Sequence, residues 1–547
     1  MPALPSAVPM WLTKPSRYER PGGGRDHLGL TGIDSFGVLA QLLPELNVVT
    51  THPRYQSFYL FVLDEYWKDE KKIASPTEYA KFFRPHEYVH SLACFMCEQP
   101  THPAEMSNVN GAGLTRGKAM RREPSYRTDV DYMDNPLGGW GYYYRSVAAG
   151  LGLILPGGRG LPSPIDRPTL LGRQLAEHFR ESVADTSYYI SHFDSDEMLL
   201  DDIVQYAQVA CLCRTADPRC SDHDLLLDVF LHSGRAAEAR RRSMRLYLNL
   251  LADTQGHRVD DETFRQLLYF GESSEGAHWQ PDKDLLEWRE CWRLWQAREY
   301  VSLALSSMWS YLCRWGESNH GITRPIRLEE FRDHLREGID LEALASQVGI
   351  SGSGLDSTSS VHDLDLWQAR YGANPLSPSS QLAESSLATT IRQGWSKSPN
   401  PNANVLAPLL MLLAVSRLPA GLPANLAAEF RRAGQGDGIS LDQLASWVES
   451  QSLDDTPIFA AAYDLTERII RLHLRVALSK LPRNTFRFQR EDGGLRFFGH
   501  SVEVDFASSR YESLSTHIRE LGLASDPLQA DHPLTEEGLR FLREGDL

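Results

Sequence analysis

The sequence has 547 residues, of which 42% are hydrophobic and 23% are charged. These fractions are ordinary for a folded protein in water, and at roughly 150 residues per domain the length predicts two to four domains. The formal net charge of −16 argues against a surface that is basic throughout, but it leaves room for a local basic face. No apolar run reaches the ~18 residues of a membrane-spanning helix. The seven cysteines are too few for a disulfide framework in so long a chain, so we expect reduced thiols and a cytoplasmic location.

The first part of the chain predicts helices separated by irregular segments. Residues 1–27 contain several prolines and no signal-peptide core, which favours a partly extended arm. Two helices are expected within residues 33–66, interrupted at Pro44, and a third over residues 75–98. Residues 101–132 lose helical periodicity and are rich in glycine and arginine, which predicts a surface loop.

Residues 138–179 predict a winged-helix-like module. A tyrosine-rich helix over residues 140–151 should end at Gly152, because glycine tolerates the left-handed conformation at a helix end. The apolar residues 153–155 resemble one strand of a wing, and Thr169 is a suitable N-cap for a second amphipathic helix.

Residues 514–542 repeat this pattern more faintly. Leu-Gly-Leu again follows a helical run, and Leu-Thr-x-x-Gly precedes a second helix, as Pro-Thr-x-x-Gly does in the first module. We therefore predict a mainly α, multi-domain protein with one or two embedded winged-helix-like modules. The expected segments are an N-terminal helical region (1–105), a winged-helix-like module with a basic loop (106–185), a helical domain (186–350), a flexible connector (351–405) and a C-terminal helical region with a hairpin and the second module (406–547).

Three further elements stand out after the first module. The segment 284–314 keeps helical spacing of large apolar residues, several of them tryptophans, and predicts a long central helix with a buried face. Residues 456–481 predict another long helix. Alternating residues around Asp492-Gly493 predict a β-hairpin.

The pattern His86-Glu87-x-x-His90 is the most specific candidate for a metal site. Histidines at positions i and i+4 of a helix face one way and can share a zinc ion, with Glu87 activating a water molecule. Cys94 and Cys97 extend the same face by further turns. Pro85 weighs against a zinc hydrolase, because it makes His86 a first-turn residue.

The other cysteines give a weaker signal. Cys211, Cys213, Cys220 and the neighbouring His223 do not have zinc-ribbon spacing, which favours buried thiols without a ligand. No phosphate-binding loop and no nucleophile elbow are found in a suitable context. No cofactor is predicted, and no residue is assigned a catalytic role.

Local groups of cations could form a phosphate-facing surface on this acidic protein. The alternative is a solvated helix face with local ion pairs, since Glu238 lies among the arginines of one group. The candidate nucleic-acid contacts are Arg116, Lys118, Arg121, Arg122, Arg145, Arg159, Arg240, Arg241 and Arg242.

One combination of short motifs resembles a known family. The motifs are Gly32-Ile33-Asp34, Leu42-Leu43-Pro44, Thr50, Arg54-Tyr55-x-Ser57-Phe58, the run 138–145 and Leu151-Gly152-Leu153, with the helix around residues 288–309. The sequence is similar in these places to a family of largely uncharacterised bacterial proteins associated with anti-phage defence islands. The resemblance implies a cytoplasmic bacterial protein that works beside partner subunits, and it brings no catalytic residues.

The leading interpretation is a non-enzymatic subunit of an anti-phage defence or DNA-transaction complex. It would bind partner proteins, with DNA as a further ligand of the basic groups. The alternatives are a metal-dependent hydrolase that uses His86 and His90, and a scaffold without DNA contact.

Overall fold

The computed structural model describes residues 26–69, 74–100, 102–103, 106–350, 352–372, 374–396, 399–417, 425–481, 484–498 and 504–545. The arm expected at residues 1–27 lies almost wholly outside these ranges. The described chain is mainly helical, as predicted. None of its helices is both long enough and apolar enough to cross a membrane. It forms two compact units: unit 1 comprises the described residues within 1–40, 265–279 and 286–507, and unit 2 comprises the described residues within 41–264, 280–285 and 508–547.

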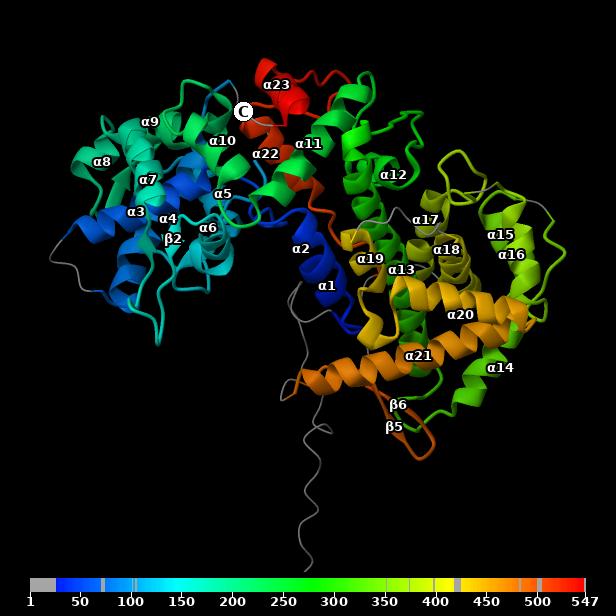
Figure 1. Cartoon of the computed structure of the whole chain (residues 1–547). Helices are drawn as coiled ribbons and strands as arrows, with labels where there is room; N and C mark the ends of the chain where they lie inside the picture. Colours follow the sequence, from blue (N-terminus) through cyan, green and yellow to red (C-terminus); the bar gives the residue numbers. More distant parts are fainter. Residues whose placement is uncertain are drawn as a thin grey trace, which may run out of the picture. The chain divides into compact units, whose positions relative to one another are not determined.

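Unit 1 is built around helix α13 (Leu286–Ser318). Side chains on all sides of α13 are buried, because helices of the same unit surround it (Figure 1). Its tryptophans Trp292 and Trp309 are almost fully buried, which confirms the predicted central helix. The helices packed against it are α17 (Glu384–Ser396), α18 (Ala407–Ser416), α19 (Asn425–Arg432) and α21 (Ile458–Ser479).

The hairpin of unit 1 is also as predicted. Strands β5 (Phe488–Glu491) and β6 (Gly494–Phe497) pair antiparallel, with Phe488 opposite Phe497. Asp492 and Gly493 connect them with φ values of 50° and 76°, the left-handed conformation that a two-residue hairpin turn requires. The unit also contains α1 (Leu30–Ile33), η2 (Asp34–Val38), α14 (Leu328–Gly338), α15 (Leu341–Gln347), α16 (Val361–Ala369), η6 (Asn402–Leu406), η7 (Gln435–Asp437) and α20 (Leu441–Leu453).

The expected connector at residues 351–405 is different in the structure. Its described residues include α16, α17 and most of η6, and Leu364, Leu387 and Ile391 are fully buried. The segment therefore belongs to the core of unit 1. Its Ser- and Asn-rich composition concealed these apolar positions in the sequence.

Two groups of packed helices in unit 2 are important for the site. Helix α3 (Tyr55–Lys68) packs against α7 (Leu170–Val183), and α4 (Pro76–Met96) packs against α5 (Ala112–Arg121) and α9 (Leu200–Ala210) (Figure 1). The other elements wholly within this unit are β1 (Ser125–Arg127), η3 (Trp140–Tyr144), α6 (Arg145–Gly150), β2 (Ile154–Leu155), β3 (Arg167–Pro168), α8 (Ser187–Ser191), β4 (Glu197–Leu199), η4 (Leu212–Ala216), α10 (His223–His232), α11 (Ala237–Asp253), η5 (Lys283–Leu285), α22 (Tyr511–Glu520) and α23 (Glu536–Glu544).

The prediction of a surface loop at residues 101–132 was wrong for the centre of that range, where the chain forms α5. Small residues on one face of α5 allow close packing on α4: Thr115 and Ala119 are buried. The Thr115 and Ser91 hydroxyl groups are 2.7 Å apart. Tertiary packing therefore stabilises a helix that its glycines would weaken in isolation.

The two predicted modules share a detailed backbone geometry. Gly152 and Gly522 both have left-handed φ values, 74° and 71°. The amide of the next residue, Leu153 or Leu523, donates to the carbonyl oxygen of the residue five positions earlier in the chain. The carbonyl oxygen of the same leucine accepts a hydrogen bond from the amide of Thr169 or Thr535. The strand pair β2–β3 is matched by a single bridge between Ala524 and Leu534.

The second helix of each module begins in the same way. Thr169 caps α7 by accepting from the Gly172 amide at 3.2 Å, and Thr535 caps α23 by accepting from the Gly538 amide at 3.0 Å. A Cβ atom on Gly172 would lie 2.1 Å from the Leu153 carbonyl oxygen. The equivalent distance for Gly538 is 1.9 Å, so glycine is required at both positions. The repeat read from the sequence is thus a structural repeat.

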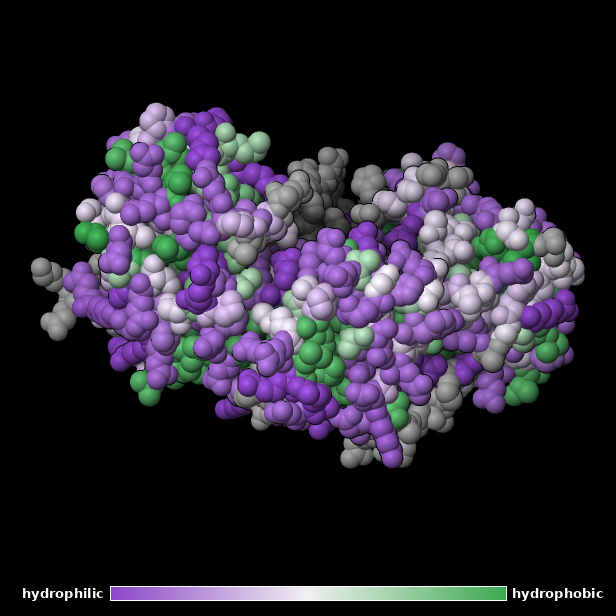
Figure 2. Space-filling view, turned by 90° about the horizontal axis from the view of Figure 1, so that it is seen from above, coloured by the Kyte–Doolittle hydropathy of each residue, from purple (hydrophilic) through white to green (hydrophobic). Residues whose placement is uncertain are grey.

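The molecular surface is largely hydrophilic on the face shown in Figure 2. Large apolar side chains that are exposed, such as Met120, Leu170 and Leu453, belong to separate helices. Single exposed apolar residues of this kind are normal for a folded protein in water.

Candidate metal centre

Four potential metal ligands converge in unit 2. They are Cys97, His102, Cys211 and Cys213, and one ligand atom of each lies within 4.8 Å of those of the other three. The Sγ atoms of Cys97 and Cys213 are 3.7 Å apart, and Cys211 Sγ is 3.6 Å from His102 Nδ1. A tetrahedral zinc site with ordinary bond lengths has S···S edges of ~3.8 Å and S···N edges of ~3.6 Å. The two measured separations therefore match the edges of a zinc tetrahedron.

The local backbone explains how the thiols reach this point. Cys97 is the first residue after α4 and has an extended conformation, so it turns away from the helix axis. Cys211 ends α9 in the same manner, and the single turn η4 follows at once and carries Cys213. Since α4 and α9 pack against each other, the ends of both helices bring their cysteines together.

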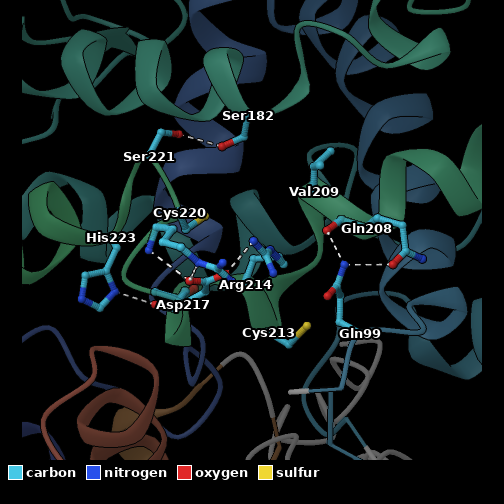
Figure 3. Close-up of polar contacts among 12 residues, drawn as sticks. Gln99, Ser182, Gln208, Val209, Cys213, Arg214, Asp217, Cys220, Ser221 and His223 are labelled. Carbon is cyan, nitrogen blue, oxygen red and sulfur yellow. Dashed lines mark hydrogen bonds and ion pairs between the residues drawn. The ribbon is translucent and has the colours of Figure 1, made fainter. Parts of the chain in front are cut away.

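Polar contacts hold the two chain segments in register next to the centre. The side-chain amide of Gln99 donates to the carbonyl oxygen and to Oε1 of Gln208, at 3.2 and 3.0 Å. Figure 3 shows this contact and the position of Cys213 near it. On the other side of Cys213, Arg214 forms an ion pair with Asp217 at 2.9 Å.

A buried arginine supports the corner between α9 and η4. Arg54 Nη1 donates to the carbonyl oxygens of Val209 and Cys211, both at 2.8 Å. Its Nε is 3.1 Å from an Asp222 oxygen, and both side chains are fully buried. Arg54 thus satisfies carbonyl groups that the end of a helix leaves without partners, and it fixes the backbone of a candidate ligand.

The centre is nearly closed to solvent. Cys211 is fully buried, Cys213 and Cys97 are 3% and 8% exposed, and His102 is half-buried at the rim. Hydrogen bonds from Cys211 and Cys213 lower the pKa of the Cys97 thiol, whereas burial raises the pKa of Cys211 well above its usual value. Contact with Cys211 lowers the pKa of Cys213, but Cys97 and burial outweigh it and raise the pKa to about 12. A divalent metal ion would compensate the three thiolates that the apoprotein cannot form together.

The structure places His86 and His90 in aromatic surroundings instead. His86 Nδ1 is 2.6 Å from the Tyr188 hydroxyl, and the His86 ring stacks on Phe193. His90 stacks on Phe58 with ring centroids 3.9 Å apart. Among the described residues neither histidine belongs to a group of three or more potential metal ligands.

Glu87 is not placed to activate a water molecule. It is fully buried and accepts hydrogen bonds from the hydroxyls of Tyr59 and Tyr132 and from the Gly139 amide. Burial raises its pKa to about 6, against the effect of these donors. The hydrolase alternative therefore receives no support from the geometry around the motif.

Most of the candidate nucleic-acid contacts on α5 and in the first module have partners close by. The Arg121 and Arg122 side chains pair with Glu123 and Glu98. The Lys118 ammonium donates to the Tyr88 hydroxyl, and Arg116 is exposed and donates to the Met106 carbonyl. Arg145 pairs with Asp166 at 2.8 Å, and Arg159 is exposed in the loop between β2 and β3.

The arginines of α11 correct one prediction. Arg240 is fully buried, where it pairs with Glu45 and donates to the Phe230 carbonyl, so it cannot meet a nucleic acid at the surface. Arg241 and Arg242 both pair with Glu238. This is the local ion pairing that the sequence offered as the alternative.

Sequence reasoning missed the metal centre because it grouped cysteines by proximity in the chain. Cys220 instead donates to Asp222, and the His223 Nδ1 contacts the Thr215 carbonyl. The pattern that could have predicted the centre consists of two pairs of ligands, Cys97-x4-His102 and Cys211-x-Cys213. The two pairs are far apart in the sequence, with 109 positions between His102 and Cys211. Comparison with protein-family models, curated proteins and solved structures found no match, so the assignment of this centre depends on its own geometry.

Proposed function

We propose that this protein is a non-enzymatic binding subunit whose unit 2 is stabilised by one zinc ion at Cys97, His102, Cys211 and Cys213. The observation that carries the proposal is the convergence of these four ligand atoms within 4.8 Å of one another, with two separations that match the edges of a zinc tetrahedron. Four protein ligands complete the coordination shell of Zn²⁺, whereas a catalytic zinc keeps one position for water or substrate. Three thiolates and one imidazole are ligands that zinc prefers.

The expected effect of zinc is to fasten distant parts of unit 2 together. The ion would connect the end of α4 to the corner between α9 and η4. In the chain-entropy description, a cross-link that closes a loop of ~100 residues stabilises the folded state by roughly 4–5 kcal/mol. A structural zinc site acts in the same direction because it forms only in the folded chain.

Metal analysis of the purified full-length protein tests this proposal. We expect one zinc per chain, lost in the double variant C97S/C213S and retained in the control C313S, whose cysteine lies on α13 in unit 1. Substoichiometric zinc that does not change in C97S/C213S would contradict the assignment. Measuring zinc in H86A/H90A in parallel tests the alternative metal site.

The binding role is supported by the two structurally repeated modules of unit 2, for which we retain the winged-helix-like interpretation. Such modules bind DNA or partner proteins through a helix and an exposed loop. Among the residues that the structure describes, no carboxylate pairs with the exposed Arg116 of α5 or the exposed Arg159 of the first module, so these are the cations best placed to reach a phosphate. We propose partner proteins and DNA as ligands, in a cytoplasmic bacterial complex of the anti-phage defence type.

A salt titration of DNA binding tests this second part. The variant R116A/R159A should bind duplex DNA more weakly and with a smaller dependence on salt, because each lost phosphate contact lowers the salt slope by about 1. The matched control is R241A/R242A, whose side chains already pair with Glu238. Equal binding by both variants, or no binding at low ionic strength, would contradict the DNA assignment.

A further inference from the structure

The metal centre contains a pair of neighbouring thiols that are less deeply buried than the third. Its least buried thiol, Cys97, lies directly beside Cys213, and the two Sγ atoms are 3.7 Å apart. A disulfide bond has an S–S length of ~2.05 Å, so a shift of roughly 1.6 Å would join them. Cys211, by contrast, is fully buried, and Arg54 binds its carbonyl oxygen.

The backbone around this pair permits such a shift. Cys97 has left α4 and is extended, and Cys213 lies in a single 3-10 turn rather than inside a long helix. Both residues stand at element ends, where hydrogen bonds are fewer than in a helix interior. The other two ligands, His102 and Cys211, are not needed for the bond to form.

We propose that the zinc centre is an oxidant-sensitive switch, in which a peroxide joins Cys97 to Cys213 as a disulfide and the zinc ion is released. The inference depends on the proposed zinc site. The Cys97 thiolate attacks the peroxide O–O bond, takes one oxygen as a sulfenic acid and releases water after protonation. The Cys213 thiolate then attacks the Cys97 sulfur, the S–S bond forms and the second oxygen leaves as water. Two electrons pass from the two sulfurs to one hydrogen peroxide, and only Cys211 and His102 remain as ligands.

The release of zinc would affect the structure of one of the two modules. The turn η4 packs against α22, the first helix of the second module. The His223 ring, which contacts the Thr215 carbonyl of η4, lies 3.2 Å from where a Cβ atom on Gly522 would be. A change in the backbone of η4 therefore acts on the helix that supports this module.

The experiment uses the zinc-loaded full-length protein and hydrogen peroxide. A chromogenic zinc chelator in the solution records release, and peptide mass spectrometry after blocking of free thiols identifies disulfides. We expect one zinc released per chain together with a Cys97–Cys213 disulfide, and recovery of zinc binding after dithiothreitol. The variant C313S should behave as the wild type, and C94S should still form the same disulfide.

The outcomes separate the two proposals. A purified protein without zinc contradicts the proposed function and the switch together. A protein that holds one zinc but keeps it in peroxide, or loses it with another cysteine pair or with sulfinic acids only, contradicts the switch and leaves the zinc site standing. Because mass spectrometry of the wild type gives the answer, the test does not depend on the folding of any variant.

Discussion

The guanidinium group of Arg54 donates a 2.8 Å hydrogen bond to the carbonyl oxygen of Cys211. This contact connects a fully buried ion pair, Arg54 with Asp222, to the backbone of a candidate zinc ligand. The zinc centre and the core of unit 2 are thus parts of one network.

Replacing Arg54 tests this connection. We expect R54A to lower the free energy of unfolding by roughly 3–5 kcal/mol, because it leaves the Asp222 carboxylate buried without its partner. It should also weaken zinc binding by about 10–100-fold, as loss of a supporting residue typically does. Urea unfolding and competition with a zinc chelator measure the two effects.

The control for R54A is R242A. Arg242 also pairs with a carboxylate, that of Glu238, but at an exposed site, where such a pair contributes only ~0–1 kcal/mol. If R54A changed stability without changing zinc affinity, the support of Cys211 by Arg54 would be excluded.

Removal of zinc by a strong chelator should lower the melting temperature by roughly 10 °C, which corresponds to a loss of about 4 kcal/mol for a unit of this size. Hydrogen exchange should become faster in α22, since η4 packs against that helix. C97S/C213S provides the comparison, because the chelator should have no effect on a chain without zinc. Unchanged exchange in α22 would show that the centre does not act on the second module.

The buried carboxyl of Glu87 gives a pH dependence of defined sign. Burial raises its pKa from 4.5 to about 6 in the folded chain, so the folded state binds a proton more tightly than the unfolded state does. Its contribution is therefore fully present below pH ~4.5 and is lost as the pH rises through about 6. A shift of this size corresponds to about 2 kcal/mol.

The variant E87Q isolates this contribution. We expect the stability of the wild type relative to E87Q to fall by about 2 kcal/mol between pH 4.5 and pH 7.5. Urea unfolding of both proteins at each pH cancels the titration of all other groups. A constant difference across this range would show that Glu87 titrates normally in the folded chain.

The repeated modules predict which glycines tolerate a methyl group. G172A and G538A should each destabilise the protein by about 1–3 kcal/mol, because the new Cβ would overlap a backbone carbonyl oxygen. Gly117 of α5 is the control: it has nothing within 4 Å of its Cβ position, so G117A should stabilise the helix by about 0.5–1 kcal/mol. Thermal unfolding compares the three, and equal effects at all three positions would contradict the close approach.

The local elements could be predicted from short stretches of the chain. The helical spacing of large apolar residues, several of them tryptophans, predicted α13, Asp492-Gly493 predicted the hairpin, and Thr169 predicted the start of α7. The sequence also revealed the repeated pattern that ends at Gly172 and Gly538. Each of these signals lies within a few residues, because helix periodicity, caps and tight turns are set by neighbouring groups in the chain.

Which distant residues meet depends on how the helices pack together. The packing of α4 on α9 brings Cys97 and His102 to Cys211 and Cys213, and no local spacing connects the two pairs. The same kind of packing makes a helix of the glycine-rich α5 and buries Arg240 against Glu45. Contacts between elements depend on how their faces fit together, and this is why the site could not be read from the chain in order.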